Sequence, residues 1–256
     1  MAIECCLALR SLLRLPLRAT QGFVEGLITL LDLPIDAPDY TTLSRRSADL
    51  SILLENFNVG GDLHVVVDSS GLKVFGEGEW KVRCHGIGKR RTWRKIHIAV
   101  DSKSHEIIAC ALTTNDFHDS QVFNDLIGPD EDISAVYADG AYDTADCYER
   151  AGECGARAII PPRHGACLDR RKNIGDGIAM RNQNILGIWE QGRKKWKKGS
   201  GYHQRSLAET GVYRLKAIFG DQLASRKFEN QATEAFIRAN ILNKMTSLGM
   251  PRSVKV

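Results

Sequence analysis

Two short apolar runs, each closed by an aspartate, constrain the fold of this chain more than any other feature. They are Leu63-His-Val-Val-Val-Asp68 and Ile133-Ser-Ala-Val-Tyr-Ala-Asp139. A run that is apolar on both faces is typical of a central, buried strand. Ligands of open α/β sheets collect at the carboxyl ends of the strands. We therefore expect Asp68, ahead of a turn at Ser69–Gly71, to lie close to Asp139.

The residues around these runs predict a mixed sheet. Trp93–Val100 and Glu106–Thr113 form a predicted hairpin around the turn Asp101–His105. The later pattern predicts a helix at 118–127 capped by Asp116, a helix at 143–151, a short strand at 156–160 and a helix at 231–248. Three antiparallel strands are thus followed by parallel α/β units. The fold class is α/β, a mixed α+β sheet with helices on its faces.

The first 58 residues predict a small all-α segment. Apolar residues at helical spacing run through positions 1–33, with a break at Leu15-Pro16 and Thr20 as the N-cap of the second piece. Another helix is expected to begin at Thr41 or Thr42 and to end near Asn58. With a hinge at residues 60–61, the domains are 1–58 and 60–250, the second carrying a basic excursion at 163–200.

Positive charge is concentrated in two segments. Seven Lys or Arg and no acid lie from Lys81 to Lys95, and the segment from Pro161 to Lys216 is also strongly basic, although the whole chain has a net charge of only +4. Such segments favour a polyanion as the partner, nucleic acid first. The alternative is a pair of solvated loops.

Membrane insertion and a disulfide framework are both disfavoured. No run reaches the roughly 18 apolar residues of a membrane span, and Arg10, Arg14 and Arg18 interrupt the leucine-rich start, unlike a signal peptide. The 7 cysteines are odd in number and include no C-x-x-C pair, which favours a reducing cytosol. One Cys/His group has a spacing that matches no standard zinc knuckle: Cys147, Cys154, His164 and Cys167.

The stretch Tyr202–Lys216 joins the acidic and basic features. Tyr202, Arg205 and Glu209 fall on one helical stripe, which Lys216 continues two turns further on. Such a stripe is suited to a carboxylate that holds a divalent metal while the cations grip phosphates. The alternative is a solvated helix face with incidental ion pairs.

The acids at positions 68, 139 and 209 imply a cation if they meet. Three neighbouring carboxylates would repel one another and raise each other's pKa values. Mg²⁺ prefers oxygen ligands, and two such ions roughly 3.5–4 Å apart serve in-line phosphoryl displacement. We therefore expect a two-metal site.

Five motifs, in order, resemble a bacterial DDE-type insertion-sequence transposase, most similar to the insertion sequence 5 family. They are Val67-Asp-Ser-Ser-Gly-Leu-Lys-Val74, Trp93-Arg-Lys-Ile-His97, Ala138-Asp-Gly-Ala-Tyr-Asp143, Ile160-Pro-Pro-Arg163 and the Tyr202–Lys216 signature. The resemblance implies an RNase H-like catalytic domain. In it Asp68, Asp139 and Glu209 correspond to the catalytic triad, which binds two Mg²⁺ ions, with Mn²⁺ as a substitute. The resemblance also assigns DNA contact and support of the signature helix to Tyr202, Arg205 and Lys216.

The implied chemistry is metal-dependent hydrolysis at the ends of the element, followed by attack of the freed 3′-hydroxyl on target DNA. The implied partners are terminal inverted repeats and target DNA, bound by a homodimer, in the bacterial cytoplasm at the nucleoid. Because relatives generally carry further N-terminal sequence for repeat binding, the resemblance indicates an N-terminally truncated copy. Two alternatives stay open: a metal-dependent nuclease of the same fold, and a catalytically silent DNA-binding remnant.

A second group of basic residues is predicted to touch DNA phosphates without reading sequence. It comprises Lys89, Arg90, Arg91, Arg94 and Lys95. Arg163, in the motif after the last strand, is also predicted to bind DNA.

Five further side chains each have more than one interpretation. His97 is expected to be a satisfied interior residue, Asp101 to belong to the hairpin turn, and Asp143 to start the following helix. Trp189 and Trp196 lie among lysines, where they either stack on an unpaired base or cover apolar surface.

Overall fold

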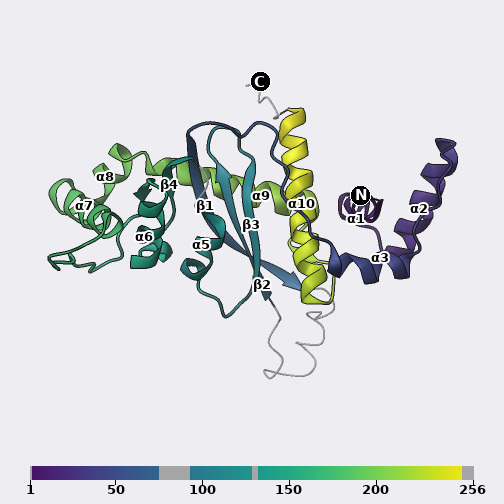
Figure 1. Ribbon diagram of the computed structural model, residues 1–256, viewed down its shortest axis with the longest axis horizontal. Coiled ribbons are helices and arrows are strands. Elements are labelled where there is room, and N and C mark those ends of the chain that lie inside the picture. Colours follow the sequence, from purple (N-terminus) through teal and green to yellow (C-terminus); the bar gives the residue numbers. More distant parts are fainter. Residues whose placement is uncertain (1, 75–92, 129–131, 250–256) are drawn as a thin grey trace.

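The computed structural model describes residues 2–74, 93–128 and 132–249 (Figure 1). Its centre is a sheet in the order β3-β2-β1-β4-β5, with β6 paired to the end of β1. β1 runs antiparallel to β2 and parallel to β4, so the sheet is mixed, as predicted. The strands are β1 (Leu63–Val74), β2 (Trp93–Asp101), β3 (Ile107–Thr114), β4 (Ile133–Tyr137), β5 (Arg157–Ile159) and β6 (Gln222–Leu223).

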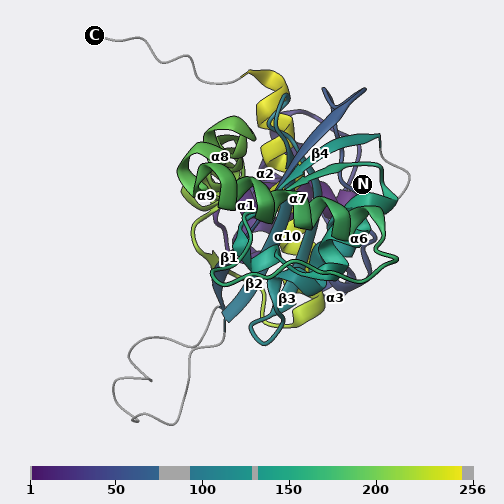
Figure 2. The same ribbon diagram turned by 90° about the vertical axis from the view of Figure 1, so that its left-hand side faces the viewer.

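Helices cover both faces of this sheet. α9 and α10 pack on one face, while α5 and α6 pack on the other, and α7 and α8 lie beyond α6 at the β5 edge (Figures 1 and 2). This α/β/α layering is consistent with an RNase H-like fold. The helices of this part are α5 (Phe123–Leu126), α6 (Ala145–Glu153), α7 (Asp176–Gln191), α8 (Arg193–Gly199), α9 (Ser206–Phe219) and α10 (Phe228–Leu248).

β1 is buried on both faces, as its composition predicts. Val65 and Val67 contribute to the core under α5 and α6, whereas Val66 and Leu72 contribute to the core under α9 and α10. The prediction of a turn at Ser69–Gly71 is wrong, because β1 continues to Val74. Pairing with β2 on one side holds the extended backbone through Lys73.

The N-terminal segment forms its own small helical cluster beside α10 (Figure 1). The break at Leu15-Pro16 is confirmed, but Thr20 is not a cap: its hydroxyl donates to the carbonyl of Pro16 inside the second helix. Asp39, rather than Thr41 or Thr42, caps the third helix, which ends well before Asn58. These helices are α1 (Ala2–Leu13), α2 (Leu17–Leu30), α3 (Tyr40–Arg46) and the 3-10 turn η1 (Ser47–Asp49).

Helix starts elsewhere also differ from the predicted ones. The segment 118–127 is a 3-10 turn, η2 (Asp119–Val122), followed by the single turn of α5, and His118 rather than Asp116 precedes it. α6 begins at Ala145 with Thr144 as its cap, so Asp143 does not start it. The basic excursion contains two helices, α7 and α8. Within the described ranges, no helix is long and apolar enough to cross a membrane.

Candidate active site

Sheet register brings Asp68 and Asp139 side by side. In the parallel pairing of β1 with β4, Val66 lies opposite Tyr137. Asp68 and Asp139 each follow two residues later, one in the interior of β1 and the other just past the end of β4. Neighbouring strands lie about 4.8 Å apart, so equivalent positions on them are close. Asp139 thus follows a strand end as predicted, and Asp68 meets it although its own strand continues.

The Tyr202–Lys216 stretch lies across the same part of the sheet. It begins as a 3-10 turn, η4 (Tyr202–Arg205), and continues as α9, which packs against β1 and β2. Gly211 permits this close packing, since a Cβ there would lie 3.4 Å from side-chain atoms of both Ile98 and Val100. Glu209, in the first turn of α9, is therefore held over the strand that carries Asp68.

Arg205 connects the three acids. Its Nη2 lies 3.5 Å from Oδ1 of Asp68 and 3.9 Å from Oδ2 of Asp139, and its Nη1 donates to Oε1 of Glu209. The two aspartate oxygens are therefore no further apart than the sum of those two distances. Residues separated by up to 141 positions in the chain meet around one guanidinium.

The electrostatics of this cluster follow from crowded, partly desolvated carboxylates. Burial raises the pKa of Asp68, and the charges of Asp139 and Glu209 raise it further, while Arg205 opposes the shift. Burial alone would lower the pKa of Arg205, but the acids, Asp68 foremost, raise it overall. Nε of Arg205 is buried and has no hydrogen-bond partner among the described residues. The cluster therefore carries excess negative charge that one arginine only partly balances.

The donor set suits a hard divalent cation. All three acids offer carboxylate oxygens, and Glu209 and Asp139 are partly open to solvent, with 54% and 38% of their side chains exposed. Within the residues described, no group of three or more His, Cys, Asp or Glu side chains is arranged around a common ion position. The guanidinium of Arg205 lies between the acids instead. A bound cation would take over the charge balance that Arg205 provides here.

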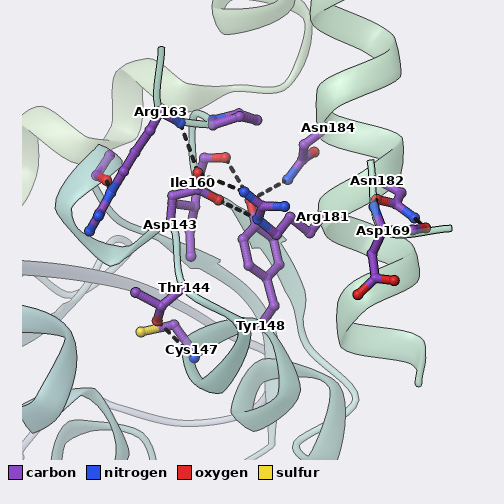
Figure 3. A network of polar contacts seen from close by, with 12 residues as sticks. Asp143, Thr144, Cys147, Tyr148, Ile160, Arg163, Asp169, Arg181, Asn182 and Asn184 are labelled. Atoms are coloured by element: carbon purple, nitrogen blue, oxygen red, sulfur yellow. Dashed lines mark hydrogen bonds and ion pairs between the residues drawn. The ribbon is translucent and has the colours of Figure 1, made fainter. Parts of the chain in front are cut away.

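A second polar network, in which Arg163 takes part (Figure 3), fixes the turn that follows Asp139. Oδ1 of Asp139 accepts the amide hydrogen of Ala141 at 2.8 Å. The guanidinium of Arg163 donates to the carbonyls of Gly140 and Ala141 at 3.0 and 2.8 Å. Arg163 was predicted to contact DNA, and in this structure its guanidinium holds the backbone after Asp139.

Asp143 in turn holds Arg163 in place by accepting a hydrogen bond from its backbone amide (Figure 3). The side chain of Asp143 is fully buried and receives two hydrogen bonds from Arg181, at 2.7 and 3.2 Å, and one from the amide of Arg163 at 2.8 Å. From the sequence, Asp143 was expected to start the following helix, and this buried role was not predicted. Its partner Arg181 lies 38 residues away on α7, so no local signal could have paired them.

Two further signature residues lie on the same side of the sheet. Nζ of Lys216 donates to the hydroxyl of Ser70 on β1 at 2.7 Å, which ties α9 to the strand just beyond Asp68. Tyr202 stacks at a tilt against the buried Trp196, and Nζ of Lys197 lies 4.7 Å from the centre of the Tyr202 ring. Desolvation raises the pKa of the Tyr202 phenol. Tyr202 thus helps to position the start of α9, and Lys216 fixes its last turn to β1.

Arg94 and Lys95, which were also predicted to contact DNA phosphates, make hydrogen bonds within the protein. Arg94 donates to Gln231 of α10 at 2.9 Å, and Lys95 donates to the carbonyl of Phe117 and to Asp119 at 2.8 and 3.1 Å. The predictions for Lys89, Arg90 and Arg91 lie outside the described residues.

Most of the residues with open interpretations have structural roles. His97 is fully buried, its Nε2 lies 2.9 Å from the hydroxyl of Thr113, and burial lowers its pKa to about 4. Asp101 accepts the amide of Ser104 in the hairpin turn. Trp196 is buried in the core, whereas Trp189 is 60% exposed, so base stacking stays a prediction for Trp189 alone.

Comparison with known protein families agrees with this geometry. Residues 60–244 match the family model described as a transposase DDE domain, and residues 1–77 match a second model of the same description. The chain belongs to the DDE transposases. As a member of this family it is related to metal-dependent enzymes that transfer phosphoryl groups of DNA. Its α/β fold with a mixed sheet is that expected of a DDE domain.

Proposed function

We propose that this DDE transposase cleaves DNA at the ends of its element and joins the freed 3′-hydroxyl to target DNA, with Asp68, Asp139 and Glu209 as the catalytic residues. The observation that carries the proposal is the meeting of these three acids at Arg205. No structural need explains three carboxylates gathered where burial, and to a lesser extent the charges of Asp139 and Glu209, raise the pKa of Asp68.

The same three carboxylates are the proposed ligands of two Mg²⁺ ions, with Mn²⁺ as a substitute. When bound, such ions activate the attacking oxygen and stabilise the leaving oxygen of an in-line displacement. The protein's own contribution is placement. β1 and β4 fix the two aspartates by register, and α9 fixes Glu209 through its packing on the sheet.

The basic side chains around this cluster have two proposed tasks. Arg205 keeps the acids together before a cation binds, and then becomes free to turn toward a phosphate. Lys216 contacts Ser70, two residues beyond Asp68 on β1, and extends the positive side of the site. The proposed partners are the terminal inverted repeats and target DNA, bound by a homodimer.

Single variants of the triad test this proposal. Asp68→Asn, Asp139→Asn and Glu209→Gln should each lower DNA cleavage with Mn²⁺ by at least about a hundredfold, a loss typical of removing one stabiliser of transition-state charge. DNA binding should stay within about twofold, because none of these residues is a cation. Asp125→Asn, which changes an exposed acid on α5, is the matched control.

The products of the same reaction separate the alternatives. Cleavage followed by joining to a target supports a transposase, whereas nicking without joining indicates a nuclease. DNA binding without any cleavage by the unmodified protein indicates a silent remnant. Normal cleavage by any one variant would remove that residue from the proposed triad.

A further inference from the structure

A basic cavity lies away from the triad, where α1 meets the end of α9, β6 and α10. Its volume is about 290 Å³, many times the ~30 Å³ share of one liquid water. Arg10 of α1, Arg14 just past the end of that helix and Arg238 of α10 line it, together with the acids Asp221 and Glu234. Glu209 lies in the first turn of α9 and Phe219 is its last residue, which places this cavity roughly 15 Å along the helix from the triad.

Arg238 is the central side chain of this cavity. It is 4% exposed, and its Nη2 donates to the carbonyl of Gln222 at 2.9 Å and to Oε1 of Glu234 at 2.5 Å. Its Nε and Nη1 are buried, and neither is hydrogen-bonded within the part of the chain that the structure describes. Buried donors without acceptors are costly and rare in native proteins. Two donors of one guanidinium therefore call for an acceptor from outside.

The acids that line the cavity do not supply that acceptor. Glu234 already accepts the amides of Ala224 and Ser225, both at 2.9 Å, besides the bond from Arg238. Asp221 is ion-paired to Lys73 at 2.7 Å. Both carboxylates thus already have partners, Glu234 with Arg238 itself and Asp221 with Lys73, and the three arginines of the cavity still outnumber its two acids.

Arg10 and Arg14 add to this excess. Arg10 makes a long contact of 3.4 Å to the hydroxyl of Ser225, and its buried Nε also has no acceptor among the described residues. Arg14 donates to the carbonyl of Ile218 at 2.8 Å, near the end of α9. Burial lowers the pKa of Arg238, the charge of Glu234 opposes that shift, and the neighbouring charges of Arg10 and Arg14 add to it. An anion in the cavity would offset the repulsion between the arginines.

We propose that this cavity binds a phosphate group between the forks of Arg10 and Arg238, with Arg14 at its open side. A planar guanidinium group can donate two parallel hydrogen bonds to two oxygens of one phosphate. Three arginines surround one space here. The phosphate comes either from the backbone of DNA or from a free phosphate ion. In the first case the cavity joins the N-terminal helices to DNA at a point distinct from the catalytic cluster.

The wild-type protein gives the first test. Inorganic phosphate, titrated at constant ionic strength with sodium chloride, should shift the side-chain Nε–Hε NMR signals of Arg10 and Arg238 and leave that of Arg45 on α3 unchanged. Calorimetry of the same titration should show saturable binding. Absence of saturation, or equal shifts of all arginine signals, would overturn the proposal.

Matched charge variants give the second test. Arg10→Gln combined with Arg14→Gln should weaken phosphate binding by at least about tenfold, the usual loss for a charged hydrogen bond. Arg45→Gln, which removes an exposed arginine outside the cavity, should leave binding within about twofold. Arg10→Lys keeps the charge but removes the planar guanidinium, so its phosphate affinity should lie between those of the double variant and Arg45→Gln. Equal phosphate affinity in all four proteins would rule the site out.

A DNA titration separates the two sources of phosphate. If a phosphodiester occupies the cavity, a short duplex shifts the same two signals and competes with inorganic phosphate. If free phosphate is the ligand, the duplex leaves both signals in place and phosphate binds as before. Catalytic activity enters neither measurement, so failure of the proposed transposase reaction would not affect this result.

Discussion

Arg205 faces Asp68, with Nη2 of the guanidinium 3.5 Å from Oδ1 of the carboxylate. The same guanidinium reaches Asp139 and Glu209, so the positive charge lies where a divalent cation would balance the acids. This relationship makes Arg205 both a support for the triad and a competitor of the metal. The two roles have different consequences when the residue is replaced.

Replacing Arg205 should strengthen metal binding. Removing a positive charge about 4 Å from the carboxylates is worth several-fold or more in cation affinity at the dielectric of a protein surface. We expect Arg205→Gln to bind Mn²⁺ about tenfold more tightly than the wild type at pH 8 in calorimetry. Arg205→Lys, which keeps the charge, should stay near the wild-type affinity. Weaker binding by Arg205→Gln would show that Arg205 organises the acids rather than competes for them.

The raised pKa of Asp68 predicts a stability cost at neutral pH. Because its pKa in the folded protein lies above the ordinary value of 3.8, the folded state holds the proton more strongly than the unfolded state. That contribution to stability is complete at low pH and is lost as pH rises through the folded pKa. Asp68→Asn should therefore raise Tm at pH 7 in metal-free buffer, by about 2 °C or more.

The pH dependence of that gain is the decisive measurement. The difference in Tm between Asp68→Asn and wild type should shrink as pH falls through the raised pKa of Asp68, because the wild-type carboxyl then takes up its proton. Asp125→Asn, on the surface of α5, should show no such trend. If the difference in Tm did not change with pH, ionisation of Asp68 would not destabilise the folded protein, contrary to this prediction.

Much of the fold could be predicted from the sequence because a buried strand has a recognisable local composition. β1, β4 and the β2–β3 hairpin follow from runs that are apolar or turn-rich. The end of β1 could not be predicted, because Ser69-Ser70-Gly71 has the composition of a turn and only pairing with β2 keeps it extended. At this position, pairing within the sheet decides the backbone conformation rather than the local sequence.

The candidate site divides in the same way. The acids at 68, 139 and 209 were identifiable from their motifs, and the structure brings them together. The partners of those acids were not identifiable. Arg181 reaches Asp143 across 38 residues, and Lys216 reaches Ser70 across 146. Such pairs depend on how helices pack on the sheet, which periodicity along one segment does not encode.

Asp143 should act in structure rather than as a fourth acid of the triad. Asp143→Ala removes a fully buried carboxylate from Arg181 and should lower the free energy of unfolding by about 3 kcal/mol, as for other broken buried pairs. Asp143→Asn keeps acceptor oxygen for Arg181 and the amide of Arg163, so we expect a smaller loss. Urea denaturation measures both.

Metal affinity then separates Asp143 from Asp139. In Asp143→Asn, Mn²⁺ affinity should stay within about threefold of wild type, whereas in Asp139→Asn it should fall at least about tenfold. An equal loss in the two variants would place Asp143 among the metal ligands.

The contact between α6 and α7 supplies a prediction about packing alone. A Cβ at Gly177 would lie 2.2 Å from the carbonyl oxygen of Tyr148 and 2.6 Å from the amide nitrogen of Glu149, both backbone atoms of α6. Gly177→Ala therefore requires the two helices to separate, and should lower the free energy of unfolding by about 2–3 kcal/mol.

Gly199 is the matched position for this test. A Cβ there meets no atom within 4 Å, and the residue is the last of α8, where alanine is favoured over glycine by at most about 0.5–1 kcal/mol, the value for a helix interior. Gly199→Ala should thus be neutral or stabilising, opposite in sign to Gly177→Ala, in the same urea denaturation series. Because Arg181 lies one turn beyond Gly177 on α7, separation of the helices should also loosen the Arg181–Asp143 pair. Gly177→Ala should then reduce DNA cleavage even at temperatures where the variant is fully folded, and unchanged stability would show that α6 and α7 do not pack this closely.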